Sequence, residues 1–137
     1  MLRRTSLQLA IASLIAGCGG GHATTSITSV PDLGMKRATE ARACLIQGGF
    51  HILGGPRPPH DANAPDVELI VNDRGPSPFI AFYRRLTRAR QLEPMIRERA
   101  ARIHGASVER RGTVTIFWPA SPEPKIRAQI ERCAFGP

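Results

Sequence analysis

Four side chains that could bind a metal ion gather around a proline-rich stretch: His51, His60, Asp61 and Asp66. Imidazole and carboxylate groups are ligands that transition metals commonly use. No two of these residues are four apart, the spacing that brings two ligands on one helix to a single ion. We therefore predict no metal ion and no other cofactor. His51 is interpreted as a half-exposed strand residue, and His60 and Asp61 as solvated turn residues. Only the tertiary structure decides whether His51, His60 and Asp66 converge.

Two serines are candidate nucleophiles, and neither lies in a known catalytic motif. Ser77 has no histidine nearby in the sequence, and Ser107 is separated from His104 by an expected helix end. The chain contains no Gly-x-Ser-x-Gly, no phosphate loop and no His-Glu-x-x-His. We interpret the protein as non-enzymatic. The alternative is a small hydrolase or metal-dependent enzyme whose site is assembled from residues far apart in the sequence.

The first eighteen residues have the layout of a bacterial export signal. Arg3 and Arg4 supply positive charge, and residues 7–16 form an apolar run that is too short to span a bilayer as a helix. Residues 15–18, Ile-Ala-Gly-Cys, resemble the lipobox of bacterial lipoproteins. The resemblance implies that Cys18 receives a diacylglyceryl group and becomes the mature N-terminus.

This resemblance divides the chain into three parts. Residues 1–17 are expected to be a lipoprotein signal peptide, and residues 18–35 a flexible tether rich in Gly, Ser and Thr. Residues 36–137 are long enough for one domain and too short for two. We expect a protein anchored by lipid to the extracytoplasmic face of the cell membrane. The alternative is a secreted protein that is cleaved near residues 21–23 and loses Cys18.

If Cys18 carries lipid or is removed, two of the three cysteines remain. An exported protein lives in an oxidising compartment, so we predict a disulfide between Cys44 and Cys133. It would close a loop of about 90 residues and contribute about 4 kcal/mol in the chain-entropy model. The alternative is two buried free thiols.

Arginine dominates the charge of the chain, which is +8 in total and +6 without Arg3 and Arg4. In an exported protein this charge meets anionic headgroups or acidic envelope polymers, so we expect no nucleic acid partner. The alternative is a solvated helix face, because arginines surround the expected helix over residues 87–104 at all its non-apolar angles. The candidate anion-binding residues are Arg84, Arg85, Arg88, Arg99 and Arg102.

The first half of the domain is predicted to hold one helix and three strands. The helix covers residues 35–49, and Gly48 supplies its stop. A short strand over residues 50–53 and a loop rich in Gly and Pro follow. Residues 67–73 and 79–83 are predicted to form a hairpin, because apolar side chains alternate along the first strand.

The second half is predicted to hold two helices and a hairpin. The main helix covers residues 87–104, with Pro94 either starting its regular part or kinking it. A hairpin over residues 107–118 turns at Gly112 and places Trp118 in the core. The last helix is expected to be capped by Ser121, with Pro122 in its first position.

The expected order is α-β-ββ-α-ββ-α. Short strands joined by tight hairpins favour an α+β fold, a two-layer sandwich with a mainly antiparallel sheet and helices on one face. We expect a membrane-anchored lipoprotein that acts as a binding or accessory module for an envelope protein or an anionic surface component. A basic structural protein resting on anionic lipid or polymer is a further alternative.

Overall fold

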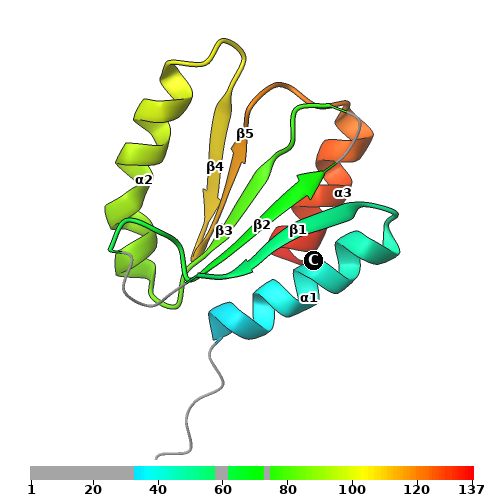
Figure 1. The fold of residues 1–137 in the computed structure, drawn as a ribbon, viewed down its shortest axis with the longest axis horizontal. Coiled ribbons are helices and arrows are strands. Elements are labelled where there is room, and N and C mark those ends of the chain that lie inside the picture. Colours follow the sequence, from blue (N-terminus) through cyan, green and yellow to red (C-terminus); the bar gives the residue numbers. More distant parts are fainter. Residues whose placement is uncertain (1–32, 58–61, 73–74) are drawn as a thin grey trace, which may run out of the picture.

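The computed structural model describes residues 33–57, 62–72 and 75–137. Its elements follow the expected α-β-ββ-α-ββ-α order (Figure 1). Helix α1 begins at Leu33, three residues before the expected start of the domain. The elements are α1 (Leu33–Gln47), β1 (His51–Pro56), β2 (Val67–Asn72), β3 (Phe79–Phe82), α2 (Leu86–Ala101), β4 (Ser107–Arg111), β5 (Val114–Trp118) and α3 (Pro124–Phe135).

The five strands form one antiparallel sheet in the order β1-β2-β3-β5-β4. Both predicted hairpins are present, and the second joins the sheet through β5, which pairs with β3. Its turn has two residues, and the first of them, Gly112, has φ +57°, which glycine adopts without strain. In this strand order β1 and β4 are the two edge strands.

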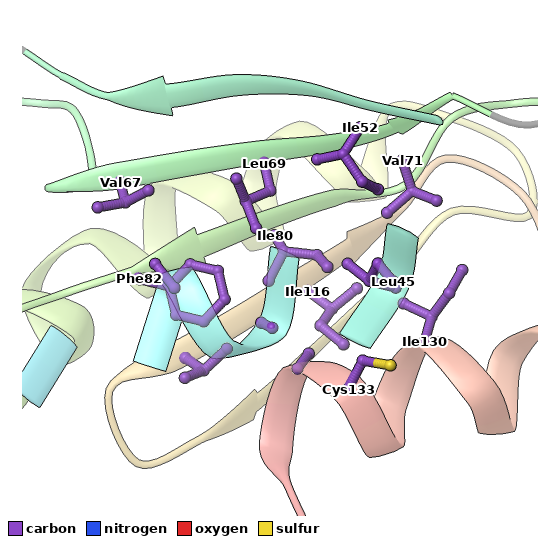
Figure 2. Close-up of a cluster of buried hydrophobic side chains, with 14 of the residues drawn as sticks. Leu45, Ile52, Val67, Leu69, Val71, Ile80, Phe82, Ile116, Ile130 and Cys133 are labelled. Atoms are coloured by element: carbon purple, nitrogen blue, oxygen red, sulfur yellow. The ribbon is translucent and has the colours of Figure 1, made fainter. Parts of the chain in front are cut away.

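Helices α1 and α3 cover one face of the sheet and enclose the main core. Figure 2 shows side chains from both helices meeting strand residues, with Leu45 of α1 and Ile130 of α3 beside Ile116. These three side chains are at most 1% exposed. The disulfide between Cys44 and Cys133 joins the two helices, with Cα atoms 5.5 Å apart and a sequence separation of 89. The bond predicted from the cysteine count is present.

Helix α2 lies on the opposite face of the sheet, where all helices were expected to share one face (Figure 1). On β3, Ile80 and Phe82 point into the main core, whereas Ala81 and Tyr83, the residue after the strand, pack with Ala89 of α2. A strand that is apolar on both sides needs cover on both sides. The α+β class and the antiparallel sheet agree with the prediction, and the position of α2 corrects it.

Contacts of β4 show the same division. Adjacent residues on this edge strand bind helices on opposite faces, as alternation along a strand requires. Glu109 accepts a hydrogen bond from Arg127 of α3 at 3.4 Å. Arg110 donates to Glu93 of α2 at 2.5 Å.

The last helix begins later than predicted. Pro124 occupies its first turn and Glu123 is the N-cap residue, so Ser121 and Pro122 do not start it. The residue before a proline is driven out of the helical region, and Glu123 is extended, with φ −55° and ψ 137°. The helix therefore starts at Pro124. Pro94 lies inside α2, which begins eight residues earlier at Leu86, so Pro94 does not start this helix.

Candidate functional site

The structure separates two of the residues that were considered as metal ligands. His51 is exposed at the start of β1, and Asp66 directly precedes β2. In the antiparallel register His51 lies opposite Asn72 and Pro56 opposite Val67, so the two side chains sit at opposite ends of the ladder. Within the described ranges, no group of three or more His, Cys, Asp or Glu residues could hold a metal ion. His60 and Asp61 lie outside the described residues.

The two serines lie on different segments of the chain. Ser77 is half-buried and lines a cavity between α2 and the sheet. His104 follows the end of α2, and Ser107 is the first residue of β4; both are exposed. The described residues that line the cavity include no histidine.

The five candidate arginines fall into two groups at the two ends of α2. Arg84, Arg85 and Arg88 lie at its start, and Arg99 and Arg102 at its end. Eleven residues separate Arg88 from Arg99, roughly 16 Å at the rise of an α-helix. The five arginines were predicted as one set of anion-binding residues, but only the second group borders the cavity.

Two members of the first group, Arg84 and Arg88, contact the loop before β2. The Arg84 backbone N–H donates to Asp66 Oδ2 at 2.8 Å, and its Nε lies 3.7 Å from Asp66 Oδ1. Arg88 donates to the carbonyl of Ala64 at 3.4 Å. These arginines hold a loop to the start of α2, which is a structural role.

The most extended apolar surface on the α2 side is a row that crosses every strand. The register pairs each member with the next, and alternation places all five on this face. The row consists of Leu53, Ile70, Phe79, Phe117 and Val108.

Helix α2 packs mainly over β4 and β5, at one end of this row. Leu53 at the other end is 45% exposed. Between the helix and the sheet lies a cavity of about 880 Å³, which we call the α2 groove. Its apolar lining comes from the sheet and from α2 and the residue positions just beyond it: Ile70, Phe79, Phe117, Leu92, Met95, Ile96 and Ile103.

Two of the groove residues are large apolar side chains that expose much of their surface. Met95 is 47% exposed and Ile103 is 41% exposed. A single exposed apolar side chain is ordinary, whereas several that line one cavity mark a binding surface. The volume also falls within the range of about 300–1,000 Å³ that is typical of ligand sites.

Charged side chains border the groove, three arginines and two glutamates. Arg57 Nε donates to Glu68 Oε2 at 2.8 Å, and Arg102 donates to Glu98 Oε1 at 2.5 Å. Among the residues that the structure describes, Arg99 has no ion-pair partner. The described residues of the border therefore have a net charge of +1, and the arginine without an ion-pair partner lies at the end of α2.

Tyr83 is the most unusual polar residue of the groove lining. It is 1% exposed, and its hydroxyl has no hydrogen-bond partner among the described residues. The pKa of Tyr83 is raised to about 12, mainly by burial, with Arg88 opposing the shift and Asp66 and Glu68 adding to it. The phenol is therefore neutral at physiological pH, and no described residue accepts a hydrogen bond from its hydroxyl.

The α2 groove was not predicted, because all helices were expected to cover one face of the sheet. In "FIAFY" and "TIFW" apolar residues occupy both faces, and that pattern indicates strands with cover on both sides. This pattern was the signal in the sequence that could have indicated a second buried surface. Trp118 was correctly placed in the main core, where it is 1% exposed.

Residues 1–17 and Cys18, on which the expected anchor rests, lie outside the described residues. In the part of the chain that is described, no helix is both long and apolar enough to cross a membrane.

Comparison of the chain with models of known protein families, with curated proteins and with solved structures finds no match. Its function must therefore be argued from its own residues.

Proposed function

We propose that the protein is a non-enzymatic binding module of the bacterial envelope, anchored to the membrane through lipid on Cys18 and binding its ligand in the α2 groove. The open groove is the observation that carries the binding role. It joins a concave apolar lining to a few polar groups at its border, which is the usual composition of a ligand site.

The anchor is supported by residues 1–18 and by the pairing of the other cysteines. Cys44 and Cys133 form a disulfide, so Cys18 remains as the third of the three cysteines in the chain. A disulfide between the first and last helices suits an oxidising compartment outside the cytoplasm. A lipid with two or more chains on Cys18 would hold the domain stably at the membrane.

A concave site favours a small ligand over a flat protein partner. Protein interfaces are broad surfaces of about 800 Å² on each partner, whereas ligand sites are clefts that enclose most of the ligand. The apolar residues of the groove face a cavity between two layers of the fold. We therefore place the envelope component in the groove and assign a solubilising role to the other exposed arginines.

The test is the intact mass of the full-length protein purified from bacterial membranes, before and after reduction and thiol alkylation. We expect the mass of residues 18–137 plus a diacylglyceryl group, with two thiols that are alkylated only after reduction. Cys18→Ser should abolish the added mass and the lipid-dependent membrane retention. Cys133→Ser is the matched control and should keep the lipid. An unlipidated chain that starts after Ala23 would refute the anchor.

A further inference from the structure

We propose that the α2 groove binds a single-chain amphiphile with an anionic headgroup, such as a fatty acid. This inference rests on the proposed function, because it names the ligand class of the same groove. It commits to one acyl chain in the cavity and to an anionic group at the border near Arg99.

The apolar lining suits a hydrocarbon chain. Ile70, Phe79 and Phe117 form three consecutive members of the row across β2, β3 and β5. With strands about 4.8 Å apart, they give an apolar floor roughly 10 Å across. Met95 and Ile103 lie on the helix side and expose apolar surface that a chain would cover. One cavity of about 880 Å³ is of the size that holds a single small ligand.

The charges at the border favour an anion over a cation. Glu68 and Glu98 are each occupied by an arginine, Arg57 and Arg102. Arg99 lines the same cavity and has no ion-pair partner among the described residues. A carboxylate at the end of α2 would therefore meet a guanidinium that no described residue neutralises. It would also lie beside Ile103, where the apolar lining reaches the border.

The location that we propose supplies such molecules. A domain tethered to a membrane works beside free fatty acids and single-chain lipids. A diacyl lipid that remains in the bilayer would instead contact the exposed face of the domain. The two cases differ in where a probe on the chain end reacts, inside the groove or on the outer surface.

The test uses the full-length protein in bacterial membranes and a fatty acid that carries a photoreactive diazirine at its chain end. After illumination, labelled peptides are mapped by mass spectrometry. We expect the label on peptides that line the groove, those containing Ile70, Phe79 and Met95, and competition by unlabelled fatty acid. Label confined to α1 or to other outer surfaces would overturn the proposal.

Two variants test the chain and the headgroup separately. Ile70→Arg places a charge on the apolar floor, and we expect labelling to fall more than about tenfold. The matched control is Ile46→Arg on α1, where the wild-type side chain is already 53% exposed, and labelling should not change. Equal loss in both variants, or no loss in Ile70→Arg, would contradict the assignment.

Arg99→Glu tests the headgroup on an exposed position where the fold should tolerate the change. We expect labelling by the fatty acid to fall about threefold, and labelling by a neutral alcohol probe of the same chain length to stay unchanged. Equal loss with both probes, or no loss with either, would overturn the anionic specificity. If Trp118 fluorescence shows that Ile70→Arg is unfolded, this pair of probes decides the proposal.

The intact mass of the same samples separates the two proposals. Lipid on Cys18 without groove labelling overturns the ligand and leaves the anchor. Groove labelling without lipid on Cys18 overturns the anchor and leaves a binding site for amphiphiles in an unanchored protein.

Discussion

The two faces of the sheet use the same strands for different purposes. Under α1 and α3 the side chains of every strand except β4 meet helix residues in a continuous core that a disulfide closes. Under α2 the buried cluster is small, comprising Ala81, Tyr83, Ala89 and Leu92, and the α2 groove opens beside it. The first face, which we call the closed face, therefore supplies most of the stability. The second face has apolar surface left to bind a ligand.

Charged side chains join α2 to the edge of the sheet. Glu93 accepts hydrogen bonds from Arg97 at 2.7 Å and from Arg110 of β4 at 2.5 Å. The hydrogen bond from Arg110 is the main reason that the pKa of Glu93 lies below its ordinary value, and Arg97 adds to it while burial opposes it. This contact fixes one side of α2 to β4, so the helix can leave its other side open over the groove.

The largest expected difference between the faces comes from the disulfide. Replacing both Cys44 and Cys133 with serine should lower the free energy of unfolding by about 4 kcal/mol. Without the crosslink, the unfolded chain regains the conformational entropy of a loop whose ends are 89 positions apart. Guanidinium unfolding followed by the fluorescence of Trp118, the only tryptophan, measures this. Cys18→Ser should leave the midpoint unchanged. A loss under about 1 kcal/mol would mean that the closed face does not need its crosslink.

Two isoleucines on neighbouring strands compare the faces directly. Ile80→Ala on the closed face removes a side chain that is 0% exposed and should cost about 3 kcal/mol. Ile70→Ala faces the groove and is half-buried, so it should cost about 1 kcal/mol or less. Urea unfolding of both variants gives the comparison. Similar costs at the two sites would show that the groove is packed as tightly as the core.

Tyr83 is the only tyrosine, so its titration reports the α2 face alone. The phenolate absorbance should appear with a midpoint of about 12 in the folded protein and about 10 in the unfolded chain. Because the folded pKa is raised, Tyr83 causes no pH-dependent loss of stability below pH about 10, and stability falls as the pH rises toward about 12, where the unfolded chain loses the phenol proton first.

Tyr83→Phe should remove this part of the alkaline decline. At neutral pH the variant should be as stable as the wild type or more stable by up to about 1 kcal/mol, since a buried hydroxyl without a partner is removed. Thermal unfolding at neutral and alkaline pH measures both effects. A clear destabilisation at neutral pH would show that the hydroxyl has a partner in solution.

Glu93→Gln should give the smallest effect and act at acid pH. The folded pKa is lowered, so the contribution of the carboxylate is present above the ordinary pKa of about 4.5 and is lost as the pH falls below it. The variant should be less stable by about 1 kcal/mol or less at neutral pH, and its stability should fall less steeply on acidification. Glu98→Gln, whose carboxylate is 68% exposed, is the control. Identical pH profiles in both variants would contradict a special role for Glu93.

Much of the fold could be read from local patterns, whereas the groove could not. Alternation at Val67, Leu69 and Val71 identified a strand, and these residues are buried on the closed face. The candidate arginines were chosen for their charge, and only Arg99 and Arg102 border the groove. Its apolar lining was missed, because Ile70, Phe79 and Phe117 meet only through the pairing of three strands.

The sequence by itself determined the element order, the two hairpins and the cysteine pair. Each of these follows from neighbouring residues or from counting, through side-chain periodicity, turn chemistry and the number of thiols. Only the tertiary structure decided that α2 covers the second face, that β5 pairs with β3 and that a groove stays open. The physical reason is that β3 is apolar on both sides. Its sequence therefore requires a helix layer on each face of the sheet, but it does not specify which helix covers which face.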